Sequence, residues 1–101
     1  MGQACPKWLA VVVRLRIPDM LRRHSGGLDV VEVGGAAVGA AFEELFARHP
    51  ELESRVLDRQ GNLYPYLALF RNGVELSHTD FRTESLTDGD DLELLAAASG
   101  G

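Results

Sequence analysis

The first part of the chain alternates apolar and polar residues in two short segments. Residues 8–17 (WLAVVVRLRI) place aliphatic side chains on one face and two arginines at the end of the other face. This period of two, rich in β-branched residues, predicts a strand that ends at Pro18, which has no amide hydrogen for a ladder. Residues 28–33 (LDVVEV) predict a second strand, closed by the turn residues Gly34 and Gly35.

Residues 36–48 follow a helical period instead. Apolar side chains recur three and four residues apart and form one stripe, which consists of Val38, Ala41, Phe42, Leu45 and Phe46. A helix of about thirteen residues is roughly 20 Å long, enough to cover a small sheet. Pro50 limits the helix, because the residue before a proline avoids helical angles. We expect the stripe to lie in the core.

The later part of the chain returns to strands. After a short helical segment predicted at 51–58, residues 64–71 (YPYLALFR) predict a third strand, and Pro65 places its start at an edge or outside the ladder. The pair at 72–73, Asn-Gly, is the strongest hairpin signal and predicts a two-residue turn with positive φ angles. A short returning strand follows at 74–76.

A polar loop then leads to the last strand. Phe81 and Leu86 are the predicted core residues of this region. Residues 87–90 (TDGD) predict a tight turn into a strand at 91–95. Two early strands, one helix and three later strands predict an α+β domain in which the helix covers one face of a sheet.

Composition indicates one globular domain. The 101 residues, 46% hydrophobic and 25% charged, argue against disorder. The net charge of −5 disfavours nucleic acid or an anionic membrane as the main partner. No apolar run could span a bilayer, no signal peptide is recognised, and the single cysteine, Cys5, excludes a disulfide framework. We expect a cytoplasmic domain at 8–96, between a flexible extension at 1–7 and a flexible tail at 97–101.

The sequence of the body offers no credible catalytic or metal site. His24, His49 and His78 are widely spaced and lack neighbouring ligand residues, so a zinc site is not expected. No phosphate-loop motif accompanies the glycine pair at 34–35. No Ser-His-Asp or Cys-His constellation can be picked out. We predict that the protein is not an enzyme and binds no cofactor or metal.

The tail is the candidate site. It consists of small residues, Ala97, Ala98, Ser99, Gly100 and Gly101. Extended, it reaches roughly 17 Å, and its glycine pair can pass a narrow channel because it has no Cβ. A terminal glycine pair also arises by chance or by truncation, so its weight comes from the segments before it. We expect residues 97–99 to insert into a partner enzyme that acts on the carboxylate of Gly101.

Arg22, Arg23 and His24 form the only basic cluster of the sequence. They lie in a connection that is too long for a tight hairpin. A solvated loop is the favoured interpretation, because such clusters are common on surfaces, and a docking site for a partner protein is the alternative.

Several segments together resemble a known family. They are the Ile17-Pro18 exit of the first strand, the helix at 38–46, FRNG at 70–73, LTDGD at 86–90 and the terminal glycine pair. From Ala10 onward the chain resembles the MoaD/ThiS family of ubiquitin-like sulfur carriers. Residues 17–27 and 50–62 resemble the CysO-type carriers of mycobacterial-type cysteine biosynthesis, whereas the Ala-Ala-Ala-Ser of the tail departs from the proline or bulkier aliphatics common in relatives.

The resemblance implies a fold and a chemistry. The fold would be β-grasp, a mixed sheet of four to five strands covered on one face by one main helix, with the first and last strands parallel at its centre. The protein would be a co-substrate that a separate adenylyltransferase of the MoeB/ThiF type activates with ATP and magnesium. The resulting acyl-adenylate would become a thiocarboxylate on Gly101. The implied partners are this activating enzyme, a sulfur-accepting enzyme such as a cysteine synthase, and a JAB-type metalloprotease that releases the product.

Three functions stay open at this point. The first is a sulfur carrier for cysteine biosynthesis. The second keeps the tail chemistry in another pathway, as a molybdopterin synthase small subunit or the carrier for a thio-containing cofactor or natural product. The third is a ubiquitin-like conjugation tag or a non-catalytic interaction module.

Overall fold

A computed structural model describes residues 11–96. These residues form the strands β1 (Val12–Arg16), β2 (Val30–Gly34), β3 (Leu67–Arg71), β4 (Val74–Glu75) and β5 (Asp91–Ala96). They also form the helices α1 (Val38–Arg48) and α2 (Glu53–Val56) and the 3-10 helices η2 (Asp19–His24), η3 (Pro50–Leu52) and η4 (Phe81–Thr83). The predicted extension at 1–7, the first three residues of the strand predicted at 8–17, and the tail predicted at 97–101 lie outside the described residues.

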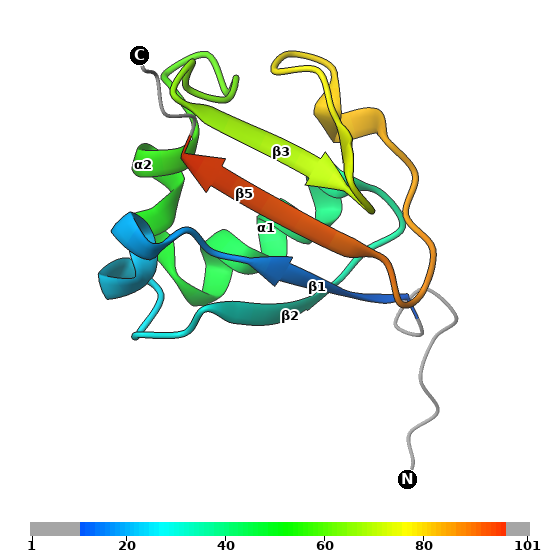
Figure 1. The fold of residues 1–101 in the computed structure, drawn as a ribbon, viewed down its shortest axis with the longest axis horizontal. Helices are drawn as coiled ribbons and strands as arrows, with labels where there is room; N and C mark the ends of the chain where they lie inside the picture. The colour runs from blue at the N-terminus through cyan, green and yellow to red at the C-terminus, as the bar shows by residue number, and fades with distance from the viewer. Residues whose placement is uncertain (1–10, 97–101) are drawn as a thin grey trace, which may run out of the picture.

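The strands form one mixed sheet in the order β2-β1-β5-β3-β4. β5 is its central strand, parallel to β1 and antiparallel to β3. Figure 1 shows α1 crossing behind this sheet, with β1, β5 and β3 in front of it. The expected α+β, β-grasp fold is confirmed, and so is the parallel pairing of the first and last strands.

The core lies between the sheet and α1. Alternate residues of β1 and β5 point toward the helix and are at most 1% exposed: Val13, Leu15, Leu92 and Leu94. The helix meets them with its apolar stripe, of which Val38, Ala41, Phe42 and Leu45 are buried while Phe46 is half-buried. Burial of this apolar surface, at roughly 25 cal/mol per Å², is the main term that stabilises the fold. Phe81 and Leu86, the predicted core residues of the late loop, are also buried.

The helix begins two residues later than predicted. Ala37 has extended backbone angles (φ −147°, ψ 163°) and forms an isolated bridge with Ser85. The amide of Val38 donates a hydrogen bond to the carbonyl oxygen of Glu84 at 3.0 Å. Pairing with a distant segment therefore overrides the helical propensity of the alanines before Val38.

Other boundaries also differ. β2 occupies Val30–Gly34 rather than 28–33, and the connection before it contains η2. β3 begins only at Leu67, whose amide donates to the carbonyl oxygen of Tyr64 at 3.0 Å in a turn that contains Pro65. The proline thus lies outside the ladder, as predicted.

Both predicted tight turns are confirmed. Asn72 and Gly73 have φ angles of 51° and 88°, which a two-residue hairpin turn of this kind requires. In the second turn, the amide of Asp90 donates to the carbonyl oxygen of Thr87 at 3.0 Å. The carboxylate of Asp88 accepts a hydrogen bond from the backbone amide of Val12, the first residue of β1, at 2.9 Å, so this turn is bonded to β1.

Candidate functional site

β5 carries the chain out of the centre of the sheet. It is paired with β1 as far as Glu93 and with β3 as far as Ala96, which lies opposite Leu67. β1 stops earlier, because Pro18 cannot donate to a ladder and the chain turns away into η2. The last three residues of β5 therefore extend beyond β1. The residues predicted as the site lie outside the described residues, and their role stays a prediction: Ala97, Ala98, Ser99, Gly100 and Gly101.

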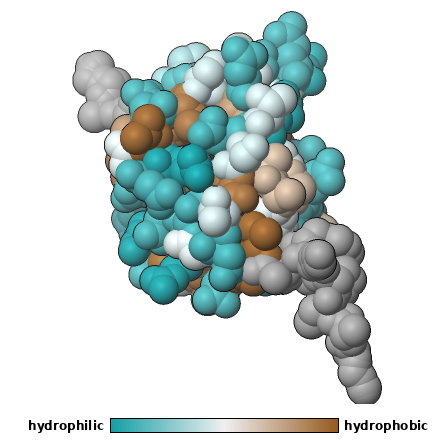
Figure 2. Space-filling model, turned by 90° about the vertical axis from the view of Figure 1, so that its right-hand side faces the viewer, coloured by the Kyte–Doolittle hydropathy of each residue, from teal (hydrophilic) through white to brown (hydrophobic). Residues whose placement is uncertain are grey.

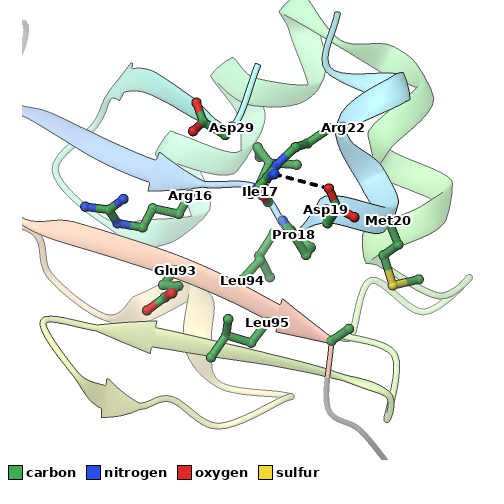
Figure 3. Close-up of a pocket in the computed structure, with 11 residues that line it drawn as sticks. Arg16, Ile17, Pro18, Asp19, Met20, Arg22, Asp29, Glu93, Leu94 and Leu95 are labelled. Atoms are coloured by element: carbon green, nitrogen blue, oxygen red, sulfur yellow. Dashed lines mark hydrogen bonds and ion pairs between the residues drawn. The ribbon is translucent and has the colours of Figure 1, made fainter. Parts of the chain in front are cut away.

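A groove results from this difference in strand length (Figure 3). It has a volume of about 480 Å³ and lies between the end of β5 and the segment that leads from β1 into η2. Met20 and Leu95 give it exposed apolar groups. Arg16, Arg22 and Glu93 add charges of both signs. Exposed apolar side chains beside charged groups suit contact with a protein surface better than capture of a small molecule.

The sequence reasoning missed the exposed apolar residues of this groove, Met20 and Leu95. Leu94 and Leu95 are adjacent in a strand, so one of them must face away from the core. Leu94 is buried and Leu95 is 41% exposed. This doublet is the signal in the sequence that identifies an apolar group on the outer face.

The opposite side of the molecule has a different surface. Figure 2 looks onto the side away from the exit of β5, and the described residues there are mostly hydrophilic, with apolar groups in small separate clusters.

The sheet face opposite α1 continues the groove. Arg14 and Arg16 of β1 are exposed on it, and their register partners on β5 are Asp91 and Glu93. Leu95 follows in the same row, two residues nearer to the exit. A band of alternating charge thus ends in an apolar residue where the chain leaves the sheet.

The predicted basic cluster lies on η2, beside this groove. Arg22 donates hydrogen bonds to the carbonyl oxygen of Ile17 at 3.1 Å and to the carboxylate of Asp19 at 3.2 Å. Arg23 is exposed.

The third member of the cluster, His24, joins η2 to η3. Its Nδ1 lies 2.9 Å from a carboxylate oxygen of Glu51. The hydrogen bond from His24 and the electrostatic interaction with the same ring lower the pKa of Glu51. Both interactions favour the ionised carboxylate. Two members of the cluster therefore contact the protein itself, and the docking role predicted for Arg22, Arg23 and His24 stays a prediction.

Two tyrosines anchor the start of β3, the strand that holds the end of β5. The rings of Tyr64 and Tyr66 stack with their centroids 5.3 Å apart. Their hydroxyls donate to the carbonyl oxygens of Ser54 and Arg55, each at 3.0 Å. These carbonyls lie at the end of α2, where helix acceptors lack partners within the helix. The stack therefore fixes the segment around α2 against the strand next to the exit.

A buried carboxylate holds the entrance to β5. Asp90 is 8% exposed. It accepts hydrogen bonds from the amide of Thr87 (2.7 Å) and from Nδ2 of Asn72 (3.0 Å). Nε of Arg71 donates a third at 3.0 Å, and Arg71 also pairs with Glu84 at 3.2 Å. The hydrogen bond from the Thr87 amide lowers the pKa of Asp90 most, followed by the interactions with Asn72 and Arg71. Each of them favours the ionised carboxylate.

Between residues 11 and 96, no three or more His, Cys, Asp or Glu side chains are arranged so that they could hold a metal ion. His78 places its Nε2 2.6 Å from the carbonyl oxygen of Leu67, and His49 follows α1 as its C-cap. In the same part of the chain, no helix is long and apolar enough to cross a membrane.

Comparison with known proteins identifies the family. The family model described as ThiS family matches residues 15–101. The chain belongs to the ThiS family. The match includes the central strand, the groove and the segment that follows β5, and it confirms the resemblance drawn from the sequence.

Relatives of this ThiS-family protein include carriers and a modifier. The sulfur carrier protein CysO of Mycobacterium tuberculosis is 29% identical over 91 residues, which cover 88% of this chain and 98% of that protein. Small archaeal modifier protein 1 of Haloferax volcanii is 40% identical over 68 residues, which cover 67% of this chain and 74% of that protein. A chain of the crystal structure of the Amycolatopsis orientalis BexX/CysO complex matches with a TM-score of 0.77 and 30% identity, covering 88% of this chain and 99% of that one. The protein is thus a ubiquitin-like relative of small sulfur carriers.

Proposed function

We propose that this ThiS-family protein is a sulfur carrier whose Gly101 carboxylate is adenylated and then converted to a thiocarboxylate. The observation that carries the proposal is that the family match runs through residue 101. The tail therefore belongs to the region that the family shares. Its origin is fixed in space, because β5 is the central strand and is paired up to Ala96.

The proposed chemistry needs a separate enzyme. A carboxylate is a poor electrophile, so an adenylyltransferase of the MoeB/ThiF type would use ATP and magnesium: a carboxylate oxygen attacks the α-phosphate and pyrophosphate leaves. A sulfur donor then attacks the carbonyl carbon, the C–S bond forms, and the C–O bond to AMP breaks. The product is a thiocarboxylate, and ionised sulfur is a good nucleophile. We assign this ATP-dependent cycle to the cytoplasm.

The small residues of the tail suit this cycle. A closed active site must hold the carbonyl of Gly101 in near-attack geometry. Gly100 has no Cβ that would block the passage, and Ala97, Ala98 and Ser99 keep the rest of the inserted segment narrow.

We place the docking surface for the activating enzyme on the groove and the sheet face beside it. Both lie next to the exit of β5, so a partner bound there would receive the tail directly. The surface offers apolar contact through Met20 and Leu95 and charge through Arg16 and Glu93. Arg23 is exposed on η2, the element that also supplies Met20 and Arg22 to the groove.

A sulfur-accepting enzyme such as a cysteine synthase is the proposed acceptor, with a JAB-type metalloprotease releasing the product. The support is the similarity to CysO over most of both chains. A molybdopterin synthase, or a pathway that makes a thio-containing cofactor or natural product, is the alternative acceptor for the same chemistry.

A conjugation tag is the second candidate function. The observation that favours it is the 40% identity to small archaeal modifier protein 1. In this case the activated carboxyl group would form an amide with a lysine of a target protein.

Intact mass spectrometry distinguishes these functions. The protein is incubated with a MoeB/ThiF-type adenylyltransferase that has been verified on its own carrier, together with ATP, magnesium and sulfide. A carrier gains the mass that corresponds to one oxygen replaced by sulfur, and a variant that lacks Gly101 does not. Amide adducts on target lysines support the tag instead. No ATP-dependent change with either sulfide or target proteins contradicts both functions.

A further inference from the structure

The positively charged side chains of this protein are almost all arginines. Of the ten Lys and Arg residues, nine are arginines, and the single lysine is Lys7. The single cysteine is Cys5. Residues 8–101 therefore contain neither an ε-amine nor a thiol, the side-chain groups that attack activated acyl groups most readily.

Two of the arginines lie near the point where the described chain ends. Arg16 and Arg22 both line the groove beside the end of β5. The register partner of Arg16 is Glu93, three residues before Ala96. Three strand residues and one strand spacing put Arg16 about 11 Å from Ala96. A tail of five residues reaches roughly 17 Å when extended, so residue 101 can return to the side chain at position 16.

The imidazole of His24, on the same element as Arg22, is held in place. The His24 side chain is 13% exposed, and its Nδ1 lies 2.9 Å from Glu51. At the other end of the sheet, the chain enters β1 at Val12, whose amide bonds to Asp88 in the turn before β5. The parallel pairing of β1 and β5 thus places the entry of the chain and its exit at opposite ends of the sheet (Figure 1).

We propose that arginine at positions 16 and 22 is a specificity device of the carrier: it supplies positive charge beside the tail without a nucleophile that could capture activated Gly101. This inference rests on the proposed function, because it requires an activated carboxyl group. A guanidinium group stays protonated above pH 12, whereas about 1% of lysine amines are neutral near pH 8.4.

A lysine at either position would end the cycle. Its nitrogen attacks the activated carbonyl carbon, the C–N bond forms, and the bond to the leaving group (AMP or a thiol) breaks. The proton of the amine passes to solvent. The product is a lactam that closes the tail onto the body. Because the amine is tethered to the same molecule, its effective concentration lies in the millimolar range.

The test uses an aryl thioester of the full chain, made at Gly101 by thiolysis of an intein fusion. No activating enzyme takes part, so the result is independent of whether the protein is adenylated. All variants carry Cys5→Ser and Lys7→Arg, which remove the native thiol and the native side-chain amine, and the α-amine of Met1 is dimethylated before thiolysis because it would also attack the thioester. The parent is compared with Arg16→Lys, which keeps the charge at a position whose side chain forms no ion pair with the described residues. Arg14→Lys is the matched control on the same strand and face.

The structure sets the expected difference between these two variants. Position 14 pairs with Asp91 and lies about 17 Å from Ala96, against about 11 Å for position 16. For a random coil of five residues, with a root-mean-square end-to-end length of about 12 Å, the probability density of the chain end at the nearer position is roughly fivefold higher. Arg16→Lys should therefore form roughly five times more lactam, a product one water lighter than the acid, and the parent should only hydrolyse.

The inference is overturned if Arg16→Lys and Arg14→Lys form equal amounts of lactam, or if Arg16→Lys forms none. The arginines beside the groove would then reflect only the arginine-rich composition of the chain. Peptide mapping must join residue 16 to residue 101, and equal melting temperatures must show that the variants fold alike. The carrier function is tested separately by the ATP-dependent change in mass. Either experiment can therefore fail without the other.

Discussion

Replacing Asp90 by asparagine tests how the entrance to β5 is held. The carboxylate accepts three hydrogen bonds, from Thr87, Asn72 and Arg71. Hydrogen bonds to charged groups contribute about 1.5–3 kcal/mol each, and their losses are not additive. Asparagine keeps one acceptor oxygen but loses the charge that faces Arg71. We expect the free energy of unfolding to fall by about 1.5–3 kcal/mol, a large share of the roughly 5–15 kcal/mol of a typical domain.

Urea denaturation followed by circular dichroism measures this loss. The matched control is Glu84→Gln, which removes the other carboxylate paired with Arg71. The Glu84 side chain is 39% exposed, so this exposed pair should contribute at most about 1 kcal/mol. The slope of the free energy against urea concentration should be the same for all three proteins, because the surface exposed on unfolding does not change.

The pH dependence gives an independent check. The pKa of Asp90 is lowered in the folded protein, below an unfolded value near 3.9. The stability that this carboxylate contributes is therefore fully present above about pH 4 and is lost as the pH falls through the folded pKa. When the pH falls below about 4, Asp90→Asn should therefore lose less free energy of unfolding than the native protein does. The reasoning is refuted if Asp90→Asn unfolds at the same urea concentration as the native protein at pH 7, or costs no more than Glu84→Gln.

Three further substitutions separate packing, backbone strain and function. Gly35→Ala would place a Cβ 2.8 Å from the backbone nitrogen of Ala41, so it should cost about 1–3 kcal/mol in urea denaturation; an unchanged midpoint contradicts this packing. A Cβ at Gly73 meets nothing within 4 Å, but φ is 88°, so Gly73→Ala should cost about 1–2 kcal/mol through strain alone, and a stabilised variant would show that the turn relaxes. Gly101→Ala should leave the melting temperature nearly unchanged and abolish the ATP-dependent mass change, whereas a large loss of stability would mean that the tail is packed.

The local sequence was sufficient to predict which face of each strand is buried and where the tight turns lie. The alternation in β1 and β5 fixes which side chains are buried, since side chains of a strand alternate between the two faces. The Asn72-Gly73 turn follows from backbone chemistry within two residues. Periodicity does not show which strands are neighbours, so the parallel pairing of β1 with β5 required the family resemblance.

Features that depend on distant segments were not predictable in this way. The helix start at Val38 is set by a hydrogen bond to Glu84, and no local signal reports it. The role of Asp90 is similar, because its donors come from two turns that meet only in the folded protein. The groove required knowledge that β1 ends three residues before β5 does, and only the exposed Leu95 hinted at it.

Fragmentation of the intact protein after activation in the presence of sulfide tests the central claim most directly. It localises the modification to a single residue of the chain. The account predicts that one oxygen is replaced by sulfur at Gly101, with every fragment that ends before Gly101 unchanged. A sulfur found at Cys5 instead, or an unaltered carboxylate at residue 101 after incubation with a demonstrably active enzyme, contradicts it.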